Sequence, residues 1–226
     1  MITKENLSKL LEQTQEIAKE VGAFIRKERQ HFDVEKVEHK GFNDLVSYVD
    51  KEAERQIVEK LSAIFPESGF ITEEGTSTTK GEKYNWVIDP LDGTTNFIHG
   101  IPVFSVSIAL MEEEKVIMGV VYEVNRHECF YAMKGGGAFC NDTPIKVSKA
   151  PDLSASLIST GFPYYNFELI DRYLNSMKSL MQKTHGLRRF GSAAVDLCYV
   201  ASGRTEGFFE YNLNSYDVAA GAIIVQ

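Results

Sequence analysis

Hydrophobic residues recur at helical spacing in two stretches near the start of the chain. Over residues 4–29 they fall three and four positions apart, which predicts an amphipathic helix with one buried face. A second helix is predicted near residues 47–64, because the same pattern returns there and Pro66 ends it. The polar segment 31–43 between them is predicted to be a strand or an extended arm. The chain therefore begins with a pair of helices.

From residue 69 the helical pattern gives way to short apolar runs that are typical of strands. The last three of these runs have short polar or charged connections, which predicts an antiparallel meander. A polar loop is predicted over residues 76–83, and the three glycines at 135–137 are predicted to be the turn after the meander. The predicted strands are residues 69–72, 85–88, 103–110, 116–122 and 128–132.

Strands and helices alternate in the second half of the chain. The change of pattern around Pro151 predicts a boundary between an N-terminal domain, residues 1–148, and a C-terminal α/β domain, residues 149–226. The first domain would hold the helix pair and the antiparallel sheet. The elements predicted in the second are a strand at 157–160, a helix at 167–183, a helix that Ser192 caps and that runs to Val200, a strand at 208–210 and an apolar helix at 218–225 that Asp217 starts.

The composition narrows the class of protein. The 226 residues are 43% hydrophobic and 25% charged, which is ordinary for a globular chain and excludes a mainly disordered or fibrous one. Lys and Arg number 24 and Asp and Glu number 32, so the formal net charge is −8. That charge disfavours a general binder of nucleic acids or anionic membranes. An acidic enzyme can still bind an anionic substrate when metal ions reverse the local charge.

The cysteines and the apolar runs indicate a cellular compartment. Three cysteines without a CxxC pair predict free core thiols and a reducing environment. No apolar run approaches the ~18 residues that a membrane helix needs, and the polar N-terminus does not resemble a signal peptide. We therefore expect a cytoplasmic protein that binds neither membranes nor nucleic acid directly.

The most informative segment places two carboxylates, Asp89 and Asp92, directly after an apolar strand. Pro90 stiffens the link between them, and Gly93 allows a positive φ or a close approach of the backbone. Thr94 then starts a predicted helix, whose free N–H groups attract an anion. Carboxylates beside an anion site call for a cation between them, and Mg²⁺ is suited to carboxylates and phosphate oxygens together. The alternative is that both residues only build a turn.

Glu73 and Asp217 have the same character, because each lies at the end of a predicted element next to an apolar run. Taken with the first pair, they give four carboxylates that could hold two or three Mg²⁺ ions around one phosphoryl group. Each residue also has an ordinary interpretation. Glu73 would be a solvated loop acid, and Asp217 would be the N-cap of the last helix.

Two separated motifs carry a resemblance to a known family. Residues 89–97 read Asp-Pro-Leu-Asp-Gly-Thr-Thr-Asn-Phe, and residues 216–221 read Tyr-Asp-Val-Ala-Ala-Gly, with Glu-Glu-Gly at 73–75 before them. The chain resembles the inositol monophosphatase family of Mg²⁺-dependent, lithium-sensitive phosphatases, although Tyr216 stands where the family usually has Trp. The resemblance implies an α+β fold, a layered αβαβα sandwich of the type shared with sugar phosphatases.

The resemblance also implies a set of metal ligands. The first ion would be bound by Glu73, Asp89 and the carbonyl of Leu91, and the second by Asp89, Asp92 and Asp217. A third, weaker ion near Glu73 would help to hold the attacking water.

By the same resemblance, Thr94 would orient that water with Asp50 as its partner, and the substrate would lie across the start of the second half. Phosphate is expected on the N–H groups of Gly93 and Thr94. Glu210 would accept bonds from two neighbouring hydroxyls, unless it is a strand-end surface acid. Lys40 resembles a family lysine near the metal site, and a plain surface lysine is the alternative. The expected substrate contacts are Asp92, Gly93, Thr94, Gly191, Ser192, Ala193, Glu210 and Asp217.

The expected activity is hydrolysis of inositol 1-phosphate, or of a related small polyol phosphate, by a homodimeric enzyme. Thr95 favours this substrate, because nucleotide 3′-phosphatases of the family usually carry Lys there and fructose-bisphosphatases carry Ser-Ser. Histidinol phosphate and fructose 1,6-bisphosphate remain alternatives. A regulatory protein associated with the transcription machinery, without required catalysis, is an alternative of another class, and a pure anion-binding module is a third.

The chain departs from the family at its end. Family members run some tens of residues beyond the second motif, whereas this sequence ends at Gln226 inside a predicted apolar helix. We therefore expect an incomplete C-terminal layer, with an exposed apolar patch and lower stability.

Overall fold

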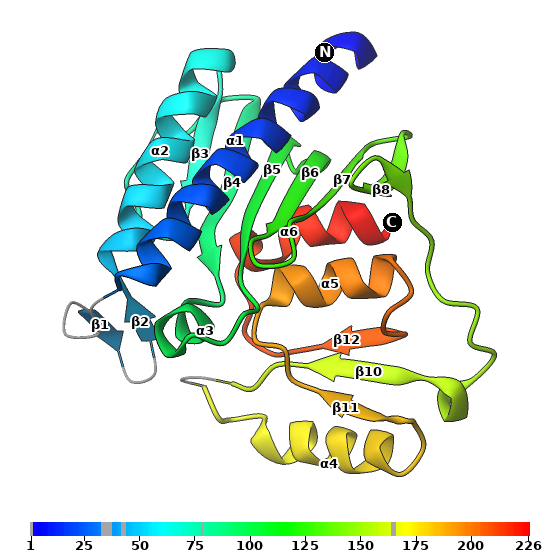
Figure 1. The fold of residues 1–226 in the computed structure, drawn as a ribbon. Coiled ribbons are helices and arrows are strands. Elements are labelled where there is room, and N and C mark those ends of the chain that lie inside the picture. The colour runs from blue at the N-terminus through cyan, green and yellow to red at the C-terminus, as the bar shows by residue number, and fades with distance from the viewer. Residues whose placement is uncertain (1, 33–37, 42–43, 78, 164–165) are drawn as a thin grey trace.

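The computed structural model stacks helices and sheets in alternating layers (Figure 1). It describes residues 2–32, 38–41, 44–77, 79–163 and 166–226, and for 38–41 and 44–46 the backbone alone. Helices α1 and α2 lie on one face of a large sheet, and α5 and α6 lie on the other. A small sheet follows below α5, and α4 is the outermost layer. The α+β sandwich with the layer order αβαβα is thus confirmed.

The first layer is the predicted helix pair, α1 (Lys4–Gln30) and α2 (Tyr48–Ile64). Thr3 caps α1 by accepting a hydrogen bond from the N–H of Asn6. Ser47 and Asp50 form a capping box at the start of α2, so each satisfies a backbone donor that the helix leaves free. The predicted bounds were right to within a residue. The polar segment between the helices holds β1 (Glu38–Gly41), which pairs with β2 (Asp44–Val46).

Within the described residues the large sheet has seven strands in the order β3-β4-β5-β6-β7-β8-β9. Strands β3 and β4 are parallel, and every later pair is antiparallel, so the predicted meander is confirmed. The turn predicted at the glycines 135–137 is confirmed: Gly135 and Gly136 lie between β7 and β8, and Gly137 begins β8. The strands are β3 (Gly69–Thr72), β4 (Tyr84–Asp92), β5 (Ser105–Glu112), β6 (Lys115–Glu123), β7 (Glu128–Met133), β8 (Gly137–Cys140) and β9 (Thr143–Pro144).

Strand β4 is longer than its predicted range, 85–88. It runs on through Pro90 to Asp92, and its register with β5 shifts between Asp89 and Asp92. A proline is tolerated in a sheet at such an irregular position, because its missing N–H leaves no ladder bond unmade. The shift therefore turns the end of the strand away from regular pairing at the place where the two carboxylates stand.

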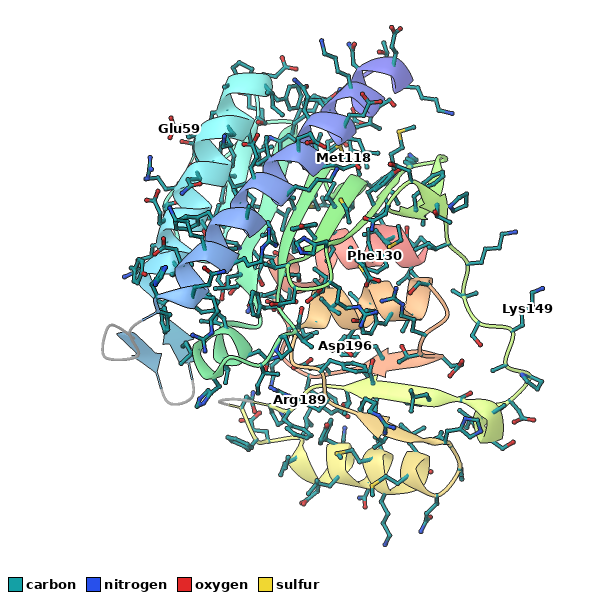
Figure 2. The ribbon with its side chains drawn as sticks, in the orientation of Figure 1. Glu59, Met118, Phe130, Lys149, Arg189 and Asp196 are labelled. Carbon is teal, nitrogen blue, oxygen red and sulfur yellow. The ribbon has the colours of Figure 1, made fainter. Side chains whose placement is uncertain are left out.

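The large sheet has an apolar core on each face. Along β4, Trp86 is buried on the side of α1 and α2, and Val87 on the side of α5 and α6, as the alternation of a strand requires. Met118 and Phe130 likewise belong to opposite cores (Figure 2). A Cβ at Gly119 would crowd the backbone of α6, so this glycine lets the last helix approach the sheet closely.

The C-terminal half adds a small parallel sheet in the order β11-β10-β12. The predicted helix 167–183 is shorter in the structure, and the boundary near residue 148 stays a prediction. No helix among the described residues is long and apolar enough to span a membrane. The elements are the 3-10 turn η2 (Leu153–Ala155), β10 (Leu157–Thr160), α4 (Ile170–Met181), β11 (Gly186–Arg188), α5 (Ala193–Ala201), β12 (Gly207–Phe209) and α6 (Ser215–Val225).

Candidate functional site

A cavity of about 440 Å³ opens where the end of β4 meets the starts of α5 and α6. Its lining comes from chain segments more than a hundred residues apart, which the layered fold brings together. Most of the predicted site residues line it. They are Glu73, Asp89, Leu91, Asp92, Gly93, Thr94, Gly191, Ser192, Ala193, Glu210 and Asp217.

The backbone after β4 makes a sharp turn at Gly93, which has φ 99° and begins the short helix α3 (Thr94–His99). A Cβ at this position would lie 3.0 Å from the carbonyl oxygen of Gly191 and 3.1 Å from that of Val103. The residue must therefore be glycine, both for its left-handed conformation and for the close approach. This turn sets Asp92 and Thr94 on the wall of the cavity.

Asp92 joins the end of β4 to the start of α5. Its Oδ2 accepts a hydrogen bond from the Ser192 hydroxyl at 2.6 Å and one from the Ala194 N–H at 2.7 Å. The pKa of Asp92 is raised to about 7. Burial is the main cause, the two hydrogen bonds oppose the rise, and the negative charge of Asp217 adds to it. Ser192 also caps α5, as predicted, so one serine serves both the helix and the carboxylate.

Asp217 is at once a helix cap and a member of the cavity wall. It is the third residue of α6 and forms a capping box with Asn214, whose N–H donates to Asp217 Oδ2. Burial raises its pKa, while the bonds from Asn214 lower it. The two interpretations of the sequence are therefore compatible, since a carboxylate can cap a helix and also accept bonds from other partners.

Asp89 is the most deeply buried of the four carboxylates, with 2% of its surface exposed. Burial raises its pKa well above the ordinary value, and the negative charges of Glu73, Asp92 and Asp217 raise it further. Its Oδ1 accepts a hydrogen bond from the N–H of Leu91 at 3.0 Å. Four acidic groups thus repel one another around one cavity, and a cation among them would relieve that repulsion.

The donor set fits Mg²⁺ in kind, since Mg²⁺ prefers carboxylate and carbonyl oxygens. Among the described residues, however, no three acidic, His or Cys side chains already converge closely enough to hold a metal ion. Hydrogen bonds occupy one oxygen of Asp92 and one of Asp217. Binding an ion would therefore compete with these hydrogen bonds and with any protons on the carboxylates, because metal ligands must be deprotonated.

Thr94 lines the cavity, and Asp50 lies behind it as its hydrogen-bond partner, outside the cavity lining. The Thr94 hydroxyl donates to Asp50 Oδ1 at 2.8 Å and lies 3.0 Å from the carbonyl oxygen of Leu91. Asp50 is 1% exposed, and its Oδ2 accepts from the N–H and hydroxyl of Ser47 at 2.9 and 2.6 Å. Burial raises the pKa of Asp50, and these hydrogen bonds oppose the rise.

Glu210 and Arg189 both line the cavity. The pKa of Glu210 is raised to about 8: burial is the main cause, the negative charge of Asp92 adds to it, and the Arg189 guanidinium opposes it. A Cβ at Gly161 would overlap the Glu210 carboxylate, so the absence of a side chain there makes room for it. The Arg189 guanidinium lies 5.6 Å from the centre of the Phe162 ring. Lys40 lies in β1, and its side chain is outside the described residues.

Sequence reasoning missed two residues of the site region, Glu54 and Asp196. Asp196 belongs to α5, lies on the side of the small sheet (Figure 2) and also lines the cavity. It is 1% exposed, and burial raises its pKa to about 8. Its signal was a lone acid in the otherwise apolar helix 193–201. Glu54 is fully buried four residues after Asp50, on the same face of α2.

Comparisons with known proteins define the family. The sequence model of the inositol monophosphatase family matches residues 6–226, so the chain belongs to this family, as the two motifs predicted. A putative Nus factor SuhB from Neisseria meningitidis serogroup B is 43% identical, over 92% of this chain and 80% of that protein. An inositol-1-monophosphatase from Mesorhizobium japonicum is 41% identical, over 83% and 71%. The crystal structure of extragenic suppressor protein suhB from Bartonella henselae matches with a TM-score of 0.91 and 40% identity, over 96% and 84%.

Proposed function

We propose that this chain is a Mg²⁺-dependent phosphomonoesterase that hydrolyses inositol 1-phosphate, or a related small polyol phosphate, to the alcohol and phosphate. The observation that carries the proposal is the gathering of four carboxylates around one cavity that is also lined by Thr94, whose hydroxyl donates to the buried Asp50. Family membership and the name of the Mesorhizobium japonicum relative support the same reaction.

The metal ligands in this proposal are the side chains of Glu73, Asp89, Asp92 and Asp217 and the carbonyl of Leu91, which all line the cavity. Two or three Mg²⁺ ions held there would supply Lewis-acid chemistry, activating water for attack on phosphorus and balancing charge on the phosphoryl oxygens. The carboxylates themselves bind and orient, because their mutual repulsion favours cations over any neutral occupant.

The chain's own residues handle the proton. The Thr94 hydroxyl can accept a hydrogen bond from a water in the cavity while it donates to Asp50. In this role Thr94 takes the proton of the attacking water and passes its own proton to Asp50 Oδ1. The raised pKa of Asp50 makes that carboxylate a better proton acceptor than an exposed aspartate.

The remaining lining residues fit the two ends of a polyol phosphate. The N–H groups of Gly93 and Thr94 would face the phosphate. The alcohol would lie against residues 191–193 and Glu210, whose ionised carboxylate can accept bonds from two neighbouring hydroxyls. Arg189 favours that ionised form, since its charge lowers the pKa of Glu210.

The test is phosphate release by the purified chain from inositol 1-phosphate, histidinol phosphate and fructose 1,6-bisphosphate, with Mg²⁺ or with EDTA. We expect inositol 1-phosphate to be hydrolysed fastest, only with Mg²⁺, and lithium to inhibit. The same sample should sediment as a homodimer. A folded protein that releases no phosphate from any of the three would overturn the proposal, and preference for another substrate would reassign it within the family.

A regulatory role is the second candidate, because several similar proteins carry the name Nus factor SuhB. The two roles separate with Asp92→Asn, which removes a proposed metal ligand. Cells that depend on this gene and behave normally with Asp92→Asn would favour the regulatory role. Cells that fail in the same way as a deletion would favour catalysis.

A further inference from the structure

Helix α2 carries two buried carboxylates on one face, four residues apart. Asp50 bonds to Thr94, as described above. Glu54, one turn later, bonds to a different segment, the turn that follows β3. Glu54 has none of its surface exposed. Burying a carboxylate completely destabilises the folded state unless hydrogen bonds satisfy its oxygens. The partners of Glu54 therefore indicate which part of the structure it holds in place.

Both oxygens of the Glu54 carboxylate are engaged. Oε2 accepts from the N–H of Glu74 at 2.8 Å. Oε1 accepts from the N–H and from the hydroxyl of Thr76, each at 2.8 Å. Three donors from a single turn thus converge on one side chain, and hydrogen bonds to a charged acceptor are stronger than neutral ones.

Glu73 lies at the start of this turn, between two fixed points of the backbone. Its own N–H donates to the carbonyl of Ile88 in β4 at 3.3 Å, and the next N–H, of Glu74, donates to Glu54. The turn has no regular secondary structure, and Gly75 within it is exposed. The bonds to Glu54 therefore take the place of the backbone hydrogen bonds that a regular strand would make. They orient the backbone from which the Glu73 side chain reaches the cavity.

We propose that Glu54 is a positioning residue: it fixes the turn of residues 73–76 and thereby sets the affinity of the site for the ion that Glu73 binds. This inference rests on the proposed function, because it takes Glu73 as a metal ligand. Outer partners of metal ligands typically change metal affinity or activity by about 10- to 100-fold when they are lost.

The experiment compares Glu54→Gln with Glu59→Gln, the same chemical change on the exposed side of the same helix. The Glu59 side chain is 73% exposed and pairs with Arg55 at the surface, so its loss should matter little. In Glu54→Gln the new amide group faces N–H and O–H donors, so at least one bond is lost. Mg²⁺ binding is measured by titration calorimetry on the full chain, and amide hydrogen exchange is measured in EDTA.

We expect Glu54→Gln to bind Mg²⁺ about tenfold more weakly and to exchange the amides of Glu74 and Thr76 faster than the unaltered chain. Glu59→Gln should match the unaltered chain in both measurements. Faster exchange together with unchanged Mg²⁺ affinity would overturn the positioning role, and so would unchanged exchange.

A second pair of variants changes Thr76, the donor partner of Glu54. It keeps the proposal testable if Glu54→Gln does not fold. Thr76→Val removes one of the three donors, and Thr76→Ser keeps the hydroxyl. Weaker Mg²⁺ binding in Thr76→Val but not in Thr76→Ser supports the proposal, and equal binding in both contradicts it. Where Glu54→Gln folds, its effect and that of Thr76→Val should be non-additive. If the unaltered chain itself binds no Mg²⁺, the proposed function fails, and hydrogen exchange still decides whether Glu54 fixes the turn.

Discussion

The hydroxyl of Thr94 donates a hydrogen bond to Oδ1 of Asp50 at 2.8 Å, across 44 positions of the sequence. The bond joins the first turn of α3, which lines the cavity, to the first turn of α2, which packs behind it. Asp50 is held in turn by Ser47 through its other oxygen. Each member of this chain of hydrogen bonds therefore has a fixed orientation before any substrate arrives.

Thr94→Val should lower kcat for inositol 1-phosphate by about 10²- to 10⁴-fold, the usual contribution of a positioned acid–base group. Valine keeps the shape of threonine but can neither bond to water nor donate to Asp50. Steady-state kinetics at saturating Mg²⁺ provide the measurement, and circular dichroism checks the fold. Thr94→Ser, which keeps the hydroxyl, is the control and should retain most of the rate; equal losses in both variants would contradict a role for the hydroxyl.

Without metal, the protein should become less stable as the pH rises from about 4 to about 8. Burial raises the pKa of Asp92 to about 7 and that of Asp196 and Glu210 to about 8, whereas carboxyls in the unfolded chain titrate near pH 4. Between these values the folded state binds more protons than the unfolded state, so the free energy of unfolding falls with increasing pH. Thermal unfolding in EDTA across this range measures the slope.

Glu210→Gln makes the cause of that slope testable. The amide does not ionise, so the decline between pH 4 and 8 should be smaller than in the unaltered chain. Glu59→Gln, at the exposed surface of α2 (Figure 2), should leave the slope unchanged. Stability that stays flat in the unaltered chain would show that these carboxyls are not destabilised by burial.

Most of the fold could be predicted, because periodicity reports which side of an element is buried. The helix pair and the meander follow from that signal alone, and the bounds of α2 were right to within a residue. Strand β11 was missed, since Gly186–Arg188 is only three residues long and none of them is fully buried. The extension of β4 to Asp92 was missed too, because Pro90 normally argues against a strand and the register shift that accommodates it is a tertiary feature.

The site was predicted through its two motifs, and the structure brings those residues to one cavity. What the sequence could not show is which acids outside the motifs are buried. Glu54 looks like an ordinary helix acid, and Asp196 is marked only by its apolar neighbours; the packing of other segments against α2 and α5 takes both side chains out of water. A pattern of residue types in one element carries no information about donors that arrive from another, such as the amides of residues 74 and 76.

Ser192→Ala should destabilise the protein by about 1 kcal/mol, the usual cost of losing an N-cap. The Ser192 hydroxyl accepts from the N–H of Val195 at the start of α5 and donates to Asp92. The same variant should weaken Mg²⁺ binding, because Asp92 loses the bond that orients it. Urea unfolding in EDTA and calorimetric titration separate the two effects. Ser202→Ala, at the other end of α5, tests for a general effect on the helix and should leave Mg²⁺ binding unchanged.

Gly161→Ala should raise KM for inositol 1-phosphate without a comparable change for p-nitrophenyl phosphate. The added methyl group would overlap the Glu210 carboxylate, so Glu210 must move away from the cavity. Overpacking of this kind typically costs about 1–3 kcal/mol of folding stability, and the displaced carboxylate no longer meets the hydroxyls of the substrate. Only the polyol offers hydroxyls to Glu210, and p-nitrophenyl phosphate does not. Glu210→Gln should show the same selective loss, whereas equal loss for both substrates would mean that the alanine disturbs the metal and phosphate end instead.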